Sequence, residues 1–261
     1  MAFRPGTRGY RVSFHFYITP GIQGLLIATV AVFLLQVLVY HFSGPFSYQR
    51  LLLWFGLVPA GVTHGLRIWQ PFTYLFLHDV NSVWHILMNM FMLWMFGREL
   101  ELTWGRNNFL RYYFLTGVGA GLINVLVKTV PLLFGGSLSL TPTIGASGAI
   151  FGILIANAVL FPDREVILFP IPIKMRMRTF VAVMIALGFL GTLGSGGDNI
   201  SHICHLGGIL VGYLYLRRSS FFYRARNHIS DWKHRRLRRK FEVYMRDRKD
   251  EPPPRPDRWV N

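Results

Sequence analysis

The sequence predicts an all-α, polytopic membrane protein that crosses the bilayer six times. Of its 261 residues, 52% are hydrophobic and only 15% are charged, which is too apolar for an ordinary soluble domain. The apolar residues gather in long runs, and basic residues flank these runs unevenly. The six candidate spans are residues 22–40, 84–96, 109–127, 147–161, 179–193 and 205–216. Several are shorter than the roughly 20 residues that a transmembrane helix needs, so their boundaries are approximate.

The distribution of basic residues predicts the orientation of these spans. Of the 28 Lys and Arg residues, 25 lie in the two terminal segments and in the second-to-third and fourth-to-fifth connections, and the other three are Arg50, Arg67 and Lys128. Cytoplasmic segments carry the excess of Lys and Arg, so both termini are predicted to be cytoplasmic. Topology therefore explains most of the net charge of +16, and nucleic acid is not an expected partner.

The chain is expected to divide into a short N-terminal segment (1–20), a membrane domain (21–216) and a basic cytoplasmic tail (217–261). The first run has no small-residue cleavage site after it, so we expect an anchor and not a cleaved signal peptide. The tail carries 15 basic and 6 acidic residues, and a helix on the anionic cytoplasmic leaflet is its best interpretation. Cys204, the one cysteine, excludes an internal disulfide and a cysteine-based metal cluster.

The connection between the first and second runs, residues 42–83, is long and aromatic-rich. It fits either a segment lying in the membrane interface or a hairpin of helices packed on the bundle. The second run then carries His85 and Asn89, four residues apart and hence on one helical face. An interhelical hydrogen bond would explain one such residue, whereas two on one face favour a site. The next turn contains Glu101, expected to accept hydrogen bonds from backbone amides at helix ends.

Ser147 lies among glycines at the start of the fourth run, in Gly145-Ala146-Ser147-Gly148. This motif alone is weak, because small residues also mark helix packing and Ala149 replaces the last glycine of the soluble hydrolase elbow. The sixth run has a similar small-residue face that begins just after His205. If the two helix starts meet, His205 and Ser147 have the arrangement that a general base and a serine nucleophile need. His202 is a competing base, and Cys204 is better explained as a small packing residue than as a nucleophile.

Three motifs now stand in chain order: Trp84-His85-x-x-x-Asn89, Gly145-Ala146-Ser147-Gly148 and Cys204-His205-Leu206-Gly207-Gly208. Together they resemble the rhomboid intramembrane serine proteases, over roughly residues 20–216. The Trp69-Gln70-Pro71-Phe72-Thr73-Tyr74 stretch and the Gly97/Glu101/Gly105 turn extend the likeness, which is greatest to the simple bacterial six-span form.

The resemblance implies a role for each matching residue. Ser147 would be the nucleophile and His205 the base, with His85, Asn89 and the backbone amide of Ser147 stabilising the oxyanion. Phe151 would pack on the catalytic imidazole and Gly145 would support the site, while His78 resembles an auxiliary loop histidine at a longer spacing than in some members. Cys204 stands where the family often has alanine.

The predicted function is that of a serine endopeptidase hydrolysing peptide bonds in or next to transmembrane segments of single-span membrane proteins. We expect a bacterial plasma-membrane location, a Ser-His dyad, and no cofactor or metal. A non-catalytic adaptor of the same fold, which binds transmembrane helices without cutting them, is the main alternative. A metal or proton transporter has suitable histidines but lacks intramembrane carboxylates and an internal repeat. A metalloprotease would need a His-Glu-x-x-His motif, which is absent from the sequence.

Overall fold

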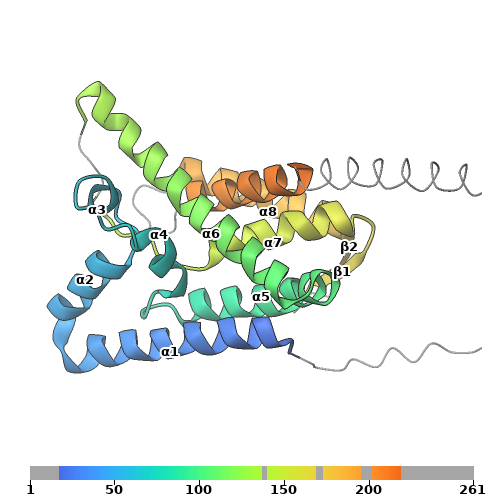
Figure 1. The fold of residues 1–261 in the computed structure, drawn as a ribbon, viewed down its shortest axis with the longest axis horizontal. Helices are drawn as coiled ribbons and strands as arrows, with labels where there is room; N and C mark the ends of the chain where they lie inside the picture. Colours follow the sequence, from blue (N-terminus) through green and yellow to red (C-terminus); the bar gives the residue numbers. More distant parts are fainter. Residues whose placement is uncertain (1–17, 137–139, 169–172, 195–201, 219–261) are drawn as a thin grey trace, which may run out of the picture. The chain divides into compact units, whose positions relative to one another are not determined.

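The computed structural model describes residues 18–136, 140–168, 173–194 and 202–218 (Figure 1). Helices occupy each of the six stretches predicted to be spans. They are α1 (Pro20–Phe42), α5 (Val83–Trp104), α6 (Arg106–Thr129), α7 (Ser147–Leu160), α8 (Met177–Gly194) and a helix over residues 202–218. Within the described ranges, two helical segments are both long and apolar enough to cross a membrane, Pro20–Phe42 and Arg106–Leu132. The basic tail beyond residue 218 lies outside the described residues, as do residues 1–17.

The second predicted span is too short, because α5 continues to Trp104 and includes the stretch expected to form a turn. The connection to α6 is reduced to Gly105, whose φ of +79° and ψ of 159° lie in a region that favours glycine. Helix geometry can therefore end and restart within one residue. As a consequence, Glu101 projects from the last turn of a helix and not from a loop.

The prediction of an all-α protein is wrong for the connection between α7 and α8. Strands β1 (Glu165–Leu168) and β2 (Ile173–Arg176) pair antiparallel there, with Glu165 opposite Arg176 and Leu168 opposite Ile173. Both segments carry β-branched residues with charged residues at their outer ends, a composition that suits a short hairpin. Such a short hairpin has too little hydrophobic periodicity to be recognised beside the long apolar runs.

The long connection after α1 folds into short helices that pack on the bundle. They are α2 (Gly44–Phe55), α3 (Pro59–Thr63), α4 (Gln70–Thr73) and the 3-10 helix η1 (Tyr74–Phe76). Helix α2 contacts α1 and α4, while α3 and α4 contact α6. The buried side chain of Gln70 joins them, because its Oε1 accepts from the Val58 N–H at 3.0 Å and its Nε2 donates to the Leu53 carbonyl at 2.8 Å. The packed-helix interpretation of this connection therefore applies, although several of its aromatic side chains remain exposed.

Helix α7 is the central helix, in contact with α5, α6, α8 and η1. Its small residues make these contacts close. A Cβ added at Gly152 would lie 2.6 Å from Cβ of Thr116 in α6, and one added at Gly148 would lie 2.9 Å from Cβ of Ala120. The hydroxyl of Tyr112 also donates to the Gly152 carbonyl at 2.8 Å. Close backbone approach of this kind is typical of helices packed in a membrane.

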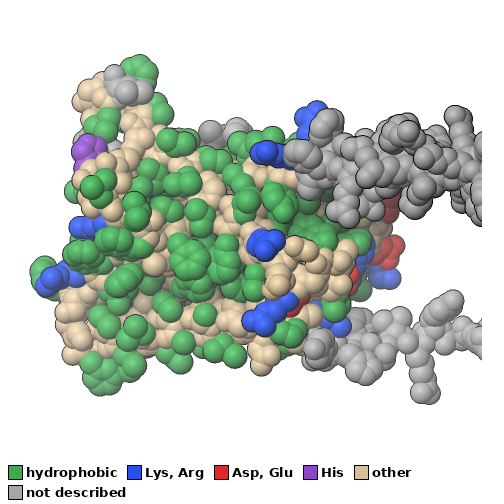
Figure 2. Space-filling view, in the orientation of Figure 1, with side chains coloured by type: hydrophobic (Ala, Val, Ile, Leu, Met, Phe, Trp, Pro, Cys, Tyr) green, Lys and Arg blue, Asp and Glu red, His purple; other side chains and the backbone are tan. Residues whose placement is uncertain are grey.

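Large hydrophobic side chains cover much of the exterior. In Figure 2 they are spread over the visible face, and the Lys and Arg side chains are few among them. Members of this set include Ile27 (62% exposed), Leu34 (56%), Leu126 (66%), Leu187 (57%) and Leu190 (60%). A soluble protein rarely exposes so extensive an apolar surface, whereas a lipid-facing surface requires it.

We expect the substitution Glu101→Gln to lower the free energy of unfolding by about 2–4 kcal/mol, because charged acceptors of buried donors are costly to remove. The Glu101 carboxylate is buried and accepts hydrogen bonds from Thr19 Oγ1 at 2.5 Å, Gly21 N at 2.7 Å and Ile22 N at 3.0 Å, at the start of α1. The measurement is an SDS-induced unfolding titration in mild detergent.

The control is Glu99→Gln, which removes a partly exposed ion pair with Arg164 and should change stability by less than about 1 kcal/mol. Equal effects of both variants would contradict the capping role of Glu101.

Candidate active site

The central feature of the site is a hydrogen bond between Ser147 and His205. Nε2 of His205 lies 2.7 Å from Oγ of Ser147, although 58 residues separate them in the chain. Ser147 is the first residue of α7, and His205 lies in the first turn of the helix over residues 202–218. His205 is buried, with 9% of its surface exposed, while Ser147 is half-buried. Two helix starts thus bring a hydroxyl and an imidazole together.

Glycines at the helix contact make this meeting possible. A Cβ added at Gly208 would overlap the carbonyl oxygen of Gly148, so these two backbones touch. One turn further on, a Cβ at Gly212 would lie 3.3 Å from Cα of Gly152. Because any larger residue would force the helices apart, the glycines determine the distance between Ser147 and His205.

The Phe151 ring fixes the plane of the His205 imidazole. The two rings stack with centroids 4.4 Å apart and an angle of 14° between their planes. Phe151 lies four residues after Ser147 on α7, so it presents its ring on the same helical face. A stacked ring restricts rotation of the imidazole and keeps Nε2 directed at the serine hydroxyl.

His85 places a hydrogen-bond donor beside the segment that leads into Ser147. The backbone N–H of Asp79 donates to Nδ1 of His85 at 3.3 Å, which assigns the proton of a neutral imidazole to Nε2. That nitrogen lies close to Gly145, because a Cβ added there would be 3.0 Å from it. Gly145 has a φ of +120°, so both its backbone conformation and the space beside His85 require glycine. The predicted supporting position at Gly145 thus has a steric reason.

Asn89 is buried on the helical face that also carries the half-buried His85, as its spacing predicts, but its described hydrogen bond is local. Nδ2 of Asn89 donates to the His85 carbonyl at 2.7 Å, within α5. The contact stabilises the helix that carries His85, and it does not extend to Ser147. An amide nitrogen has a second donor, so this bond does not use the full capacity of the side chain.

His78 lies behind His85, with the two ring centroids 5.1 Å apart. Its backbone is held by Gln36 of α1, whose Oε1 accepts from His78 N at 2.9 Å and whose Nε2 donates to His78 O at 3.0 Å. Burial is the main reason that the pKa of His78 falls to about 3, so its imidazole is neutral. Gln36 was not predicted as part of the site, although a glutamine within an apolar run is a visible signal in the sequence.

The loop before Ser147 is held by backbone and side-chain hydrogen bonds. Thr143 and Leu57 form an antiparallel bridge, with both N···O distances 2.9 Å, and the Gly145 N–H donates to the Tyr74 carbonyl at 3.0 Å. The Thr143 hydroxyl accepts from Asn124 Nδ2 at 3.2 Å and from Lys128 Nζ at 3.1 Å. These residues were also missed by sequence analysis, because the long-range pairing of a loop leaves no periodic pattern.

The two competing residues of the sixth helix have other described partners. The ring of His202 meets that of His205 edge-on, with centroids 5.7 Å apart. Cys204 is buried, and its Sγ lies 3.3 Å from the hydroxyl of Tyr74. The Ser147 hydroxyl therefore has His205 as its imidazole partner, and Cys204 has the packing position expected of it.

Chemically, the arrangement unites a hydroxyl, a base and oriented N–H donors. An imidazole within hydrogen-bond distance can take the serine proton and so activate the oxygen for attack on a carbonyl. The first backbone N–H groups of α7, beginning with that of Ser147, have no carbonyl partner within the helix. No ion pair joins His205 to an Asp or Glu within the described ranges.

Comparison with known proteins identifies the family. The Rhomboid domain family matches residues 65–219, which is more than half of the chain. Similar proteins include Rhomboid protein 1, mitochondrial, of Saccharomyces cerevisiae (32% identical over 52% of this chain and 38% of that protein). Another is the human Presenilin-associated rhomboid-like protein, mitochondrial (29% identical, 52% and 34%).

Rhomboid protease AarA of Providencia stuartii is 29% identical over 73% of this chain and 72% of its own length. The chain spans less than two fifths of the length of the mitochondrial relatives. With a mostly helical fold and a family match over more than half of its length, this membrane protein belongs to the rhomboid family, which includes named rhomboid proteases.

Proposed function

We propose that the protein is an intramembrane serine endopeptidase that cleaves single-span membrane proteins in or next to their transmembrane segments. The observation that carries this proposal is the 2.7 Å contact between Nε2 of His205 and Oγ of Ser147. A serine hydroxyl is a weak nucleophile until a base accepts its proton, and this contact supplies the base.

The reaction follows from the positions of the donors and acceptors. His205 takes the Ser147 proton as the hydroxyl oxygen attacks the peptide carbonyl, and it then gives that proton to the leaving amine. The developing oxyanion is met by the Nε2–H of His85 and the backbone N–H of Ser147, with Asn89 as a further donor. Water hydrolyses the acyl-enzyme in the second half of the reaction, with His205 again as the base.

We propose a plasma-membrane protein of the simple bacterial six-span form, and the charge distribution supports placing both termini in the cytoplasm. The substrate is expected to enter beside α8. This helix packs on α7 and on the hairpin strands, and its exposed leucines face outward, which leaves a lipid-facing side open to a transmembrane helix. The basic tail is proposed to lie on anionic lipid.

The test is cleavage of a single-span substrate by the full chain in proteoliposomes, together with labelling by a fluorophosphonate probe. A serine hydrolase forms a covalent adduct at Ser147 and releases two fragments. A rhomboid-like adaptor would bind the transmembrane helix but give neither fragments nor adduct. If neither the fragments nor the adduct forms while substrate binding is retained, the adaptor function is favoured over the protease function.

His85→Ala should lower kcat for this cleavage by about 10²- to 10³-fold, because one oxyanion donor is lost. KM should change little, since the donor acts mainly on the charge that develops in the transition state. The matched control is His64→Gln, which changes an exposed histidine whose described contact is with Thr63 and should leave kcat unchanged. Equal rates for His85→Ala and wild type would remove His85 from the oxyanion site.

A further inference from the structure

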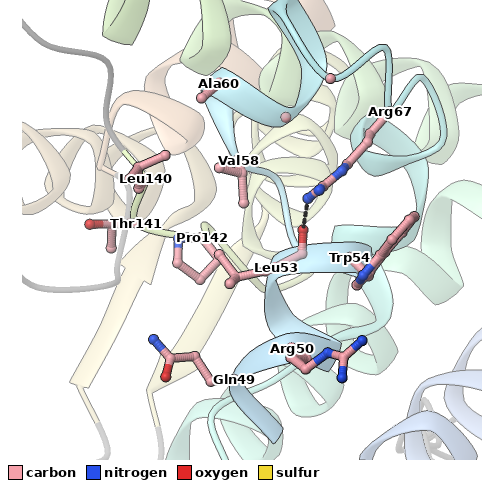
Figure 3. Close-up of a pocket in the computed structure, with 12 residues that line it drawn as sticks. Gln49, Arg50, Leu53, Trp54, Val58, Ala60, Arg67, Leu140, Thr141 and Pro142 are labelled. Atoms are coloured by element: carbon pink, nitrogen blue, oxygen red, sulfur yellow. Dashed lines mark hydrogen bonds between the residues drawn. The ribbon is translucent and has the colours of Figure 1, made fainter. Parts of the chain in front are cut away.

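A cavity of about 720 Å³ lies beside the loop that leads into Ser147, and Figure 3 shows its lining residues. Its walls come from three places: the second half of α2, the α3 region as far as Arg67, and residues 140–142. The third wall continues directly into Thr143 and Gly145. The cavity is therefore separate from the dyad, although it shares one backbone segment with it.

Two guanidinium groups give the cavity its charge. Arg67 Nη1 donates to the Leu53 carbonyl at 2.8 Å, and its Cζ lies 4.7 Å from the centre of the Trp54 ring. This one bond uses one of the five N–H donors of a guanidinium, while the bond and the ring together hold the group in place. Arg50, one turn before Trp54, supplies the second guanidinium from an exposed position. No carboxylate is among the residues that line the cavity in the described chain.

The surroundings of the cavity are apolar and aromatic. The rings of Trp54 and Trp69 stack 6.0 Å apart at an angle of 5°, and they are 47% and 39% exposed. Nearby, Phe55 is 48% and Ile68 is 80% exposed. Exposed tryptophans beside cationic groups are typical of the boundary between the hydrocarbon and headgroup regions of a bilayer. The cavity thus combines a cationic end with a hydrophobic surround.

From this combination we infer that the cavity binds the phosphodiester head group of a membrane phospholipid. Guanidinium groups match phosphate oxygens in geometry and charge. Apolar lining residues, among them Leu53, Val58 and Leu140, provide a surface for the glycerol and upper acyl carbons. An acidic peptide would satisfy the arginines, but it would leave this apolar surface and the exposed rings around it without a partner.

A phospholipid bound in the cavity would connect α2 to the loop before Ser147. A head group bound by Arg50 and Arg67 would share the cavity with Thr141 and Pro142, which also line it. Beyond these residues, the Leu57–Thr143 bridge ties the same two segments together. A bound phospholipid would therefore brace the loop that carries Gly145.

The experiment uses the full chain in dodecyl maltoside, titrated with phosphatidylglycerol and followed by native mass spectrometry. The double variant Arg50→Gln/Arg67→Gln should retain this lipid at least about tenfold more weakly, since charge-assisted hydrogen bonds to phosphate are lost. Arg50→Gln alone should weaken binding in the same direction without disturbing the fold, because Arg50 is exposed. The control Arg111→Gln removes an exposed arginine outside the cavity and should bind as wild type does.

Three further ligands distinguish the sources of the anion. A galactolipid without phosphate should bind wild type and the double variant equally weakly. Inorganic phosphate and a soluble hexaglutamate peptide should not displace phosphatidylglycerol at millimolar concentration. The inference is overturned if all arginine variants retain the phospholipid as wild type does, or if either phosphate or the peptide displaces it. None of these readouts depends on proteolysis, so failure of the protease assignment would leave this test intact.

Discussion

Ser147→Ala and His205→Ala are each expected to lower the rate of substrate cleavage by about 10⁴-fold or more, to the background of the assay. The first substitution removes the oxygen that attacks the carbonyl, and the second removes the base 2.7 Å from it. Because the two groups act in one step, the double variant should be no slower than either single variant. The measurement is the rate of fragment release from a single-span substrate in proteoliposomes.

Stability and substrate binding provide the controls for this series. Ser147→Ala removes one hydroxyl of a half-buried residue, so unfolding in SDS should occur near the wild-type midpoint, whereas His205→Ala removes a buried ring stacked on Phe151 and should unfold at a lower SDS fraction. Fluorophosphonate labelling should disappear in Ser147→Ala. His202→Ala is the matched histidine variant, and it should keep most of the activity because the described contact of His202 is with the ring of His205. If His202→Ala were inactive and His205→Ala active, the assignment of the base would be reversed.

Gly208→Ala is expected to lower the free energy of unfolding by about 3 kcal/mol and to reduce cleavage by about 10²-fold or more. The added Cβ would overlap the backbone carbonyl of Gly148, which cannot move aside as a flexible side chain can. The helices must then separate, and this movement lengthens the distance between Ser147 and His205. SDS titration and the cleavage assay together measure the two effects.

The matched control for this prediction is Gly24→Ala in α1. An added Cβ there would have no atom within 4 Å, so the substitution should be neutral or stabilise by up to about 1 kcal/mol through helix propensity. A Gly208→Ala protein as stable and as active as wild type would mean that the helix over residues 202–218 does not touch Gly148. The geometry of the dyad would then need another explanation.

Local signals in the sequence were sufficient for the helices and for the residues that meet at the site. Each apolar run became a helix, since a run long enough to be buried in lipid must satisfy its backbone internally. Ser147 and His205 were recognisable because each lies at the start of such a run, next to glycines. The hairpin of β1 and β2 and the extension of α5 to Trp104 were not predicted, because short segments and helix ends carry weak patterns.

What a polar side chain contacts was decided only by the tertiary structure. The spacing of His85 and Asn89 predicts a shared face, but only the fold shows that Asn89 donates to the His85 carbonyl and that Asp79 orients the His85 ring. The same holds for Gln36, which contacts the backbone of His78 from 42 residues away. Hydrophobic periodicity determines which face of a helix is buried, whereas hydrogen bonds depend on which elements meet there. The sequence by itself therefore determined where the helices lie and that the three motifs resemble those of rhomboid proteases. The packing of α1, α5, α6 and α7 decided how the polar residues of these motifs are positioned.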